Sequence, residues 1–457
     1  MRSGSVEHLS QNNFMAKTKK IQDYDRLYAF LRYYVDLALK LSYRSIRYVG
    51  RERIPQDGAV IYAPNHTNAL MDALVILAMD QKAKVFVARA DIFKKPLLAK
   101  IFKFLKIMPI MRMRDGIDEV KKNAETIEKA VDVLRDKVPF CIFPEGTHQA
   151  KYSSLPLSKG IFRIAFQAQE LMPDMPLYIV PVGMRYGSFF RFRSTLRVQI
   201  GEPINVGEYI TSHSDMTPQE QMNHMKDMLA ERMQKAIFYI PNDEDYDATY
   251  DICGAVVKRR AQIIRRRRDE QRKRGLDAYF EANNATVQQI ARLKAEKPEV
   301  AERLLALGKE AAEIRKANRI SLSSVAAKNP FWSRLLKTII LILKLPYNIP
   351  VTILTLPIKL LCNFIFTKIK DYAFRNSIRF ILNLLLWPVL IIIYSIIAFA
   401  LLPWQWALLV SVLLMPAPIV AHETFRLVRM MFSDMRFKRN KELRKKYDQI
   451  RAIIFNE

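Results

Sequence analysis

Apolar and polar positions divide the chain into three parts. Between 49 and 214, short apolar runs alternate with amphipathic helical patterns, which predicts an α/β domain with a mixed sheet flanked by helices. Residues 215–327 have a polar, helical pattern, and the region from 328 is largely apolar until charges return at 422. Strands are predicted at 59–63, 84–88, 107–111, 140–143, 177–182 and 196–200, with helices at 123–136 and 158–171.

The N-terminal residues have two predicted parts. Residues 1–25 contain no apolar signal-peptide core and predict a disordered lead, in which Met15 is a second possible start. Residues 26–48 interleave aromatic and leucine side chains with Arg and Lys at helical spacing, which predicts a helix lying in a membrane interface. The alternative is an amphipathic helix that covers the domain. The same two interpretations apply to the lysine-rich pattern of 94–106.

A basic helical region is predicted over 215–327. It opens on TPQE at 217–220, which offers an N-cap, a proline in the first helical position and a glutamate that closes a capping box. The run KRRAQIIRRRRDEQRKR at 258–274 is strongly basic. We interpret this run either as a solvated helix face or as a patch held against anionic lipid.

The apolar C-terminal third predicts a transmembrane hairpin. Residues 378–402 carry one charge, on Arg379, and are long enough to cross a bilayer core of about 30 Å. A second apolar stretch at 407–421 follows an uncharged turn that contains Trp404 and Trp406. Tryptophans favour the membrane interface, so this turn is expected at the far side of the bilayer.

Basic residues flank both ends of the two predicted transmembrane helices, 379–421. The positive-inside rule therefore places the α/β domain in the cytoplasm, together with a basic tail at 422–457. Residues 328–378 are apolar but interrupted by prolines and lysines. That pattern predicts an interfacial or re-entrant segment.

Charge and composition narrow the class of partner. A formal net charge of +28 and a pI near 9.9 indicate a polyanionic partner: nucleic acid, an anionic membrane face or phosphorylated substrates. Hydrophobic residues make up 50% of the chain and concentrate toward its C-terminus, which favours a membrane. The arginine-rich run contains no aromatic residue for base stacking, so nucleic-acid binding is disfavoured. Cys141, Cys253 and Cys362 lie far apart and predict neither a disulfide nor a zinc site.

The first candidate for chemistry is PNHTNALMDAL, residues 64–74. Apolar IYAP running into NHTN predicts a strand-to-helix turn. His66 and Asp72 would sit about 120° apart on a regular helix, so they meet only if His66 lies on the turn and Asp72 reaches back. A carboxylate bound to one imidazole nitrogen leaves the other nitrogen free as a general base. The alternative is a surface pair or a satisfied core histidine.

Two further blocks place polar groups at predicted strand ends. FPEGTHQ at 143–149 offers Glu145, which can orient a polyol hydroxyl or an arginine, and Gly146, which allows close backbone approach. An ordinary turn is the alternative interpretation. PIMRMRDG places Arg112 and Arg114 after another strand. A guanidinium fork suits a phosphate monoester, although these arginines can equally mark an exposed strand end.

Together and in this order, the blocks NHTNALMD, IMPIMR, FPEGTHQ and YIVPVGM resemble the PlsC-type phosphate acyltransferases of glycerolipid synthesis over about residues 50–205. The resemblance implies that His66 deprotonates the acceptor hydroxyl as it attacks an acyl thioester, and that Asp72 orients His66. The same resemblance implies a site that holds the glycerol phosphate. The residues assigned to that site are Arg112, Arg114, Glu145, Gly146 and Thr147.

Two departures from the family pattern bear on the acceptor. Five residues separate His66 from Asp72, where four are commonest, and this spacing resembles a branch that includes glycerol-3-phosphate and dihydroxyacetone-phosphate acyltransferases. His148 and Gln149 stand where many members have Arg and Ser. A usual phosphate contact is therefore in doubt, and Arg114 is a candidate to replace it.

The expected function is a membrane-bound acyltransferase of phospholipid synthesis, in the cytoplasmic (inner) membrane. The expected acceptor is 1-acylglycerol-3-phosphate, with glycerol 3-phosphate or dihydroxyacetone phosphate as the alternative, and the donor is acyl-CoA or acyl carrier protein. We expect an anionic phospholipid membrane as a partner, no nucleic acid, no bound cofactor and no metal. A non-catalytic basic protein that binds membranes or nucleic acid is the alternative from another class.

Overall fold

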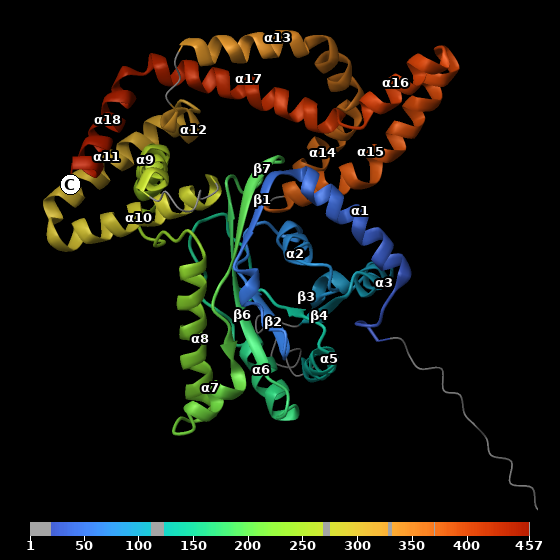
Figure 1. Cartoon of the computed structure of the whole chain (residues 1–457), viewed down its shortest axis with the longest axis vertical. Coiled ribbons are helices and arrows are strands. Elements are labelled where there is room, and N and C mark those ends of the chain that lie inside the picture. Colours follow the sequence, from blue (N-terminus) through green and yellow to red (C-terminus); the bar gives the residue numbers. More distant parts are fainter. Residues whose placement is uncertain (1–19, 111–122, 268–274, 328–330, 370, 457) are drawn as a thin grey trace, which may run out of the picture.

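The computed structural model describes residues 20–110, 123–267, 275–327, 331–369 and 371–456 (Figure 1). Most of the predicted lead, together with Arg112 and Arg114, lies outside the described residues. Eight strands form one sheet in the order β1-β7-β6-β2-β5-β3-β4, with β8 paired to β6. The strands are β1 (Tyr43–Val49), β2 (Ala59–Pro64), β3 (Val85–Arg89), β4 (Ile107–Ile110), β5 (Phe140–Cys141), β6 (Leu177–Tyr186), β7 (Ser194–Ile200) and β8 (Ile204–Asn205).

The sheet is mixed, as predicted. Strands β6, β2, β5, β3 and β4 run parallel, β7 is antiparallel to β6, and β1 is parallel to β7. Strand β2 is buried along its whole length, as expected of a central parallel strand with both faces covered. Ile61 pairs with Phe140 of β5 and with Ile179 of β6. The loops that leave β2 and β5 therefore emerge side by side at one edge of the sheet.

Helices cover both faces of the sheet. One face packs against α5 (Asn123–Arg135), α6 (Gly160–Leu171), α7 (Val206–Ser212) and α8 (Pro218–Ala236). The other face packs against α1 (Arg26–Ser42), α2 (Leu70–Leu77) and the first part of α15 (Phe374–Leu401). Leu39 of α1, Ile76 of α2 and Phe380 of α15 share this second core. A long apolar helix of the C-terminal third thus contributes directly to the α/β domain.

A separate helical region stands beside the sheet, at the upper left of Figure 1. It comprises α9 (Tyr246–Arg267), α10 (Gly275–Glu296), α11 (Pro298–Ala317), α12 (Leu322–Ala326) and α18 (Lys441–Asn456). The buried carboxylate of Asp251 joins three of these helices, because it accepts hydrogen bonds from Arg315 at 2.6 Å and Tyr447 at 2.7 Å. Pairing makes this buried charge tolerable and holds the C-terminal helix against α9 and α11.

The remaining helices are mostly apolar and gather at the top of Figure 1. They are α13 (Phe331–Leu354), α14 (Leu356–Lys368), α15, α16 (Trp404–Leu414) and α17 (Ala417–Arg439). Among the described residues, Leu335–Leu354 and Phe374–Leu401 are long and apolar enough to cross a membrane. The pair α16 and α17 also passes that test when joined, but the two helices are bent by 57°.

The N-terminal helix is shorter than predicted. It ends at Ser42, and residues predicted to continue it form β1, which pairs with β7 from Tyr43 to Val49. The pairing partner lies about 150 residues away along the chain, so local spacing could not reveal it. The described end of the predicted lead is also held in place, because Lys20 binds Asp132 at 2.9 Å.

Segment boundaries differ from the prediction in three further places. Helix α8, which begins with the predicted capping box, belongs to the core of the α/β domain rather than to the region that follows it. The predicted basic tail, 422–457, contains α18, which packs in the helical region. The segment predicted as interfacial or re-entrant contains α13, which stays helical through Pro346 and Pro350 and has the length of a span.

Burial of Phe380 predicts that α15 stabilises the α/β domain. Phe380 is 5% exposed in the core beneath the sheet, whereas Phe399 on the same helix is 51% exposed. Replacing Phe380 by Ala should lower the unfolding free energy by about 3 to 5 kcal/mol, because it removes packed apolar surface and leaves a cavity. Thermal unfolding of the purified chain in detergent measures this effect. Phe399→Ala is the matched control, and equal melting temperatures for the two variants would contradict the prediction.

Candidate active site

Two loops meet at the edge of the sheet where β2 and β5 end. The first carries His66 and enters α2, and the second carries FPEGTHQ. They are joined directly, since the backbone N–H of Gln149 donates to the carbonyl of His66 at 3.2 Å. Asn65 pins the first loop to β6 through two hydrogen bonds with the backbone of Met184. These hydrogen bonds therefore fix the positions of the two loops relative to each other and to β6.

His66 and Asp72 meet as the sequence pattern requires. His66 lies on the turn before α2, and Asp72 lies in the first turn of that helix. The imidazole Nδ1 is 2.8 Å from Oδ2 of Asp72, whose side chain is fully buried, while the side chain of His66 remains 18% exposed. Among the described residues, no hydrogen bond engages Nε2 of His66. Binding at Nδ1 favours the tautomer in which Nε2 carries a free lone pair.

The carboxylate of Asp72 organises the whole turn. Its Oδ2 also accepts the backbone N–H groups of Thr67 and Asn68, each at 2.7 Å, and its Oδ1 accepts the hydroxyl of Tyr186 at 2.6 Å. Burial raises the pKa of Tyr186, so its hydroxyl stays protonated and remains a donor. The carboxylate oxygens of Asp72 act only as acceptors, toward N–H and O–H groups, which suits an ionised carboxylate.

Backbone strain is concentrated at the entrance of α2. Ala69, the residue before the helix, has φ 45° and ψ −126°, a backbone conformation that residues other than Gly rarely adopt. Such a conformation costs about 1 to 3 kcal/mol and persists only where neighbouring contacts enforce it. Here the two backbone bonds to Asp72 on the preceding residues enforce it. The same bonds hold Thr67 and Asn68 in the orientation that brings His66 to the carboxylate.

Glu145 lies beneath the loops and is 7% exposed. Its Oε2 accepts the backbone N–H of His66 at 3.2 Å, and its Oε1 accepts that of Leu155 at 3.4 Å. Burial raises the pKa of Glu145 to about 8, although these two N–H donors act in the opposite direction. Both oxygens accept backbone N–H groups of the protein, which supports a positioning role for Glu145. Its expected role in substrate binding stays a prediction.

Gly146 and Thr147 lie on the surface of the second loop. Gly146 has φ +64°, and a Cβ added there would meet nothing within 4 Å, so the loop is open at this point. Thr147 is exposed. Both residues are therefore accessible beside His66, as a substrate-binding role requires. That role remains a prediction.

Aromatic rings and a second histidine complete the surroundings of His66. Its ring stacks on Phe143 with centroids 4.2 Å apart and meets the edge of His148 at 5.4 Å. Nε2 of His148 lies 2.7 Å from Oδ2 of Asp371, and its ring meets that of Phe374 at 5.5 Å. The segment that begins α15 therefore forms one wall of the site.

Sequence reasoning missed Tyr186, Asp371 and Phe374. Tyr186 ends a strand that was predicted four residues too short, and the wall residues lie more than 220 positions from His148. Their composition carries no motif, so only the fold reveals them. Among the described residues, no group of three or more His, Cys, Asp or Glu side chains is arranged to hold a metal ion.

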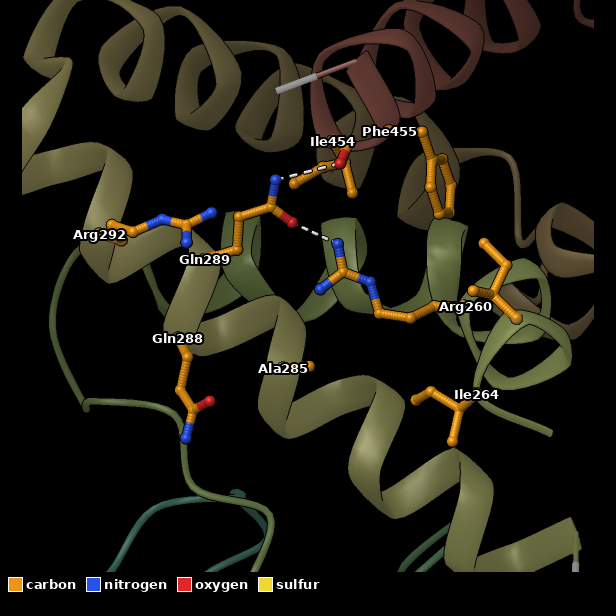
Figure 2. Close-up of a pocket in the computed structure, with 9 residues that line it drawn as sticks. Arg260, Ile264, Ala285, Gln288, Gln289, Arg292, Ile454 and Phe455 are labelled. Carbon is orange, nitrogen blue, oxygen red and sulfur yellow. Dashed lines mark hydrogen bonds between the residues drawn. The ribbon is translucent and has the colours of Figure 1, made fainter. Parts of the chain in front are cut away.

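A cavity of about 550 Å³ lies elsewhere, between α9, α10 and α18. Figure 2 shows the amide of Gln289 between the guanidinium group of Arg260 and the backbone of Ile454, bound to both. Arg292 and Phe455 also line the cavity. None of the described residues predicted for chemistry lines this cavity.

Comparison with known proteins assigns the α/β domain. Residues 45–185 match the model of the family described as Acyltransferase. This part of the chain is an acyltransferase-family domain. The matched span covers both site loops and the strands that hold them.

Curated relatives match the domain over part of their length. The chain is 33% identical over 135 residues to "Glycerol-3-phosphate O-acyltransferase 2" of Saccharomyces cerevisiae, which is 29% of this chain and 18% of that protein. It is 26% identical over 171 residues to "1-acyl-sn-glycerol-3-phosphate acyltransferase" of Cocos nucifera, which is 37% of this chain and 51% of that protein. The chain thus spans about half or less of the length of these relatives.

One solved structure also resembles the chain. The crystal structure of the 1-acyl-sn-glycerophosphate (LPA) acyltransferase, PlsC, from Thermotoga maritima is 19% identical, with a TM-score of 0.34. The likeness covers 47% of this chain and 83% of that one. It is too weak to bear on the site or the reaction of the acyltransferase-family domain.

Burial of Glu145 predicts a pH dependence of stability. The folded chain keeps a proton on this carboxyl up to pH 8 or so, whereas the unfolded chain loses it near the ordinary pKa of 4.5. The stability that this group contributes is therefore full below its unfolded pKa and is lost as pH rises through about 8. Glu145→Gln cannot ionise, so its melting temperature should rise relative to the parent chain across that interval.

Thermal unfolding in detergent at a series of pH values tests this prediction. Glu170→Gln on α6 is a suitable control, because Glu170 is exposed and its substitution should give a curve parallel to that of the parent. A Glu145→Gln curve that also stays parallel to the parent would show that Glu145 is ionised throughout.

Proposed function

We propose that the chain is a membrane-bound O-acyltransferase that moves a fatty acyl group from a thioester donor to a hydroxyl of a glycerol-phosphate acceptor. One observation carries the proposal: within an acyltransferase-family domain, His66 is partly exposed, a buried carboxylate holds its Nδ1, and no hydrogen bond among the described residues engages its Nε2. A thioester is already activated, so the reaction needs a positioned base and a bound acceptor rather than a covalent nucleophile.

The geometry suits general-base catalysis by His66. Nε2 takes the proton of the acceptor hydroxyl as its oxygen attacks the thioester carbonyl. The new C–O bond forms, the C–S bond breaks, and the imidazolium returns the proton to the departing thiolate. Asp72 stabilises the imidazolium and fixes its orientation, with Tyr186 holding the carboxylate from behind. A base of this kind contributes about 10² to 10⁴ in rate.

Two acceptors are supported by different observations. The wall made by Asp371 and Phe374 comes from a helix long enough to span a membrane, which favours an acceptor that resides in the bilayer, such as 1-acylglycerol-3-phosphate. Similarity to yeast proteins named as glycerol-3-phosphate O-acyltransferases favours glycerol 3-phosphate. Gly146 and Thr147, together with Arg112 and Arg114, are the residues that we propose to hold the acceptor.

The apolar exterior supports attachment to a membrane. Besides α13 and α15, the helix α1 exposes Leu27, Phe30 and Tyr33, and α3 (Pro96–Phe104) exposes Leu97 beside its lysines. The helices α1 and α3 are in contact, since the rings of Tyr28 and Phe104 lie 6.1 Å apart. Side chains of this kind suit the headgroup region of a bilayer. We propose that the sheet faces the cytoplasm, beside the inner membrane.

Acyl transfer by the purified chain tests the proposed function. The assay crosses 1-acylglycerol-3-phosphate, glycerol 3-phosphate and dihydroxyacetone phosphate with acyl-CoA and acyl carrier protein thioesters, and follows the acylated product. We expect transfer to at least one of these glycerol-phosphate acceptors. Absence of product from every combination, with the chain folded in lipid, would refute the proposed function.

Substitution of His66 tests the mechanism. His66→Gln should lower kcat by about 10² to 10⁴ without a matching change in melting temperature, because it removes the base and keeps a polar side chain. His224→Gln is a matched control on α8, where His224 is exposed and bonds to Tyr209. Turnover by His66→Gln at the rate of the control would exclude His66 as the general base.

A further inference from the structure

Several arginines converge on one carboxylate where α17 meets the acyltransferase-family domain. Arg44 of β1 lies 2.7 Å from the carboxylate of Glu423. Arg193, which precedes β7, lies 3.5 Å from it, and Arg426 of α17 lies 2.9 Å from it. One carboxylate therefore serves three guanidinium groups that come from separate elements of the fold.

More arginines surround this group without a carboxylate of their own. Across the part of the chain that the structure describes, no ion pair is found for Arg191, Arg379 or Arg429. Arg429 nevertheless acts electrostatically on both Arg191 and Arg379, so the three belong to one positive field. We name the set the interfacial arginine cluster: Arg44, Arg191, Arg193, Arg379, Arg426 and Arg429.

Positive charge in the cluster is not balanced by the protein. Glu423 is the one carboxylate that the described residues pair with these six arginines. Desolvation by the surrounding chain, followed by repulsion from Arg429 and Arg426, lowers the pKa of Arg191. Like charges held together in this way are destabilising unless an anion joins them. Both Arg191 and Arg429 are exposed, so an anion can reach them.

A histidine, His422, lies within the electrostatic reach of the cluster and has a nitrogen that no described residue satisfies. Nε2 of His422 is buried and has no hydrogen-bond partner among the described residues. Its ring meets the edge of Phe192 at 5.1 Å, and Arg191, Arg379 and Arg429 all act on it electrostatically. A group from outside the chain is one way in which such a buried polar atom is satisfied.

The location of the cluster indicates which anion it meets. Arg379 lies near the start of α15, a candidate span, and Arg429 lies on α17 one turn after Phe425, whose side chain is exposed. The end of a membrane-spanning helix lies at the depth of the lipid headgroups. Arginine forks bind phosphate oxygens with two hydrogen bonds each, and exposed aromatic side chains suit the same layer.

We propose that the interfacial arginine cluster binds the phosphate of an anionic phospholipid from the surrounding bilayer. The lipid phosphate joins Arg191, Arg379 and Arg429, for which the described residues supply no ion pair, while Glu423 holds the other three arginines in place. The inference rests on the proposed function only in taking α15 to lie in a membrane. It does not depend on which acceptor the enzyme uses.

Binding of defined lipids to the full-length chain in a non-ionic detergent tests this proposal. The probes are phosphatidylglycerol, zwitterionic phosphatidylcholine and inorganic phosphate, and bound lipid is counted by native mass spectrometry. The double variant Arg191→Gln with Arg429→Gln should bind phosphatidylglycerol at least about tenfold more weakly, since each charged hydrogen bond contributes about 1.5 to 3 kcal/mol. The corresponding double Lys variant keeps the charge and should retain part of the affinity.

The control removes the same number of positive charges, both from the last turn of α17. Arg436→Gln with Arg439→Gln changes two exposed arginines in the last turn of α17 and should leave phosphatidylglycerol binding within about twofold of the parent, because charges beyond a Debye length of about 10 Å are largely screened. Equal binding by the two double variants overturns the proposal. So does equal affinity for phosphatidylcholine, or displacement of the lipid by inorganic phosphate at comparable concentration. Lipid binding is read without turnover, so a failed acyl-transfer assay leaves this result intact.

Discussion

The buried carboxylate of Asp72 is the constraint on which the site depends. It accepts hydrogen bonds from the ring of His66, from two backbone N–H groups and from Tyr186. Removing such a charge from water is costly, and these four donors offset that cost. The same bonds hold the strained backbone at Ala69 and fix the imidazole tautomer. One side chain therefore determines both the path of the chain into α2 and the chemistry that His66 can perform.

Glu145 supports this arrangement from the neighbouring loop. Parallel pairing of β2 with β5 brings the two loops together, and Glu145 then binds the backbone of His66 itself. The second loop leaves Gly146 and Thr147 open to solvent on the same side. In this loop, a buried Glu145 that binds the backbone of His66 is thus followed by two exposed residues.

Membrane helices and the acyltransferase-family domain are parts of one structure. Helix α15 buries Phe380 beneath the sheet, while the residues just before and at its start, Asp371 and Phe374, contact His148 beside His66. The arginines of the interfacial cluster come from the same junction between domain and helices. The candidate membrane span and His66 are thereby brought close to one another through His148. The segment that begins α15 therefore forms a wall of the site, and the same helix is a candidate membrane span.

The sequence by itself determined six strands, the mixed α/β domain, the apolar helices and the meeting of His66 with Asp72. These follow from local periodicity, capping residues and spacing, which act over a few positions. Only the tertiary structure decided that 43–49 is a strand, that α18 packs in the helical region, and that Tyr186 and Asp371 adjoin the site. Each of those outcomes depends on partners more than a hundred residues away, and pairing over such distances leaves no local pattern to read.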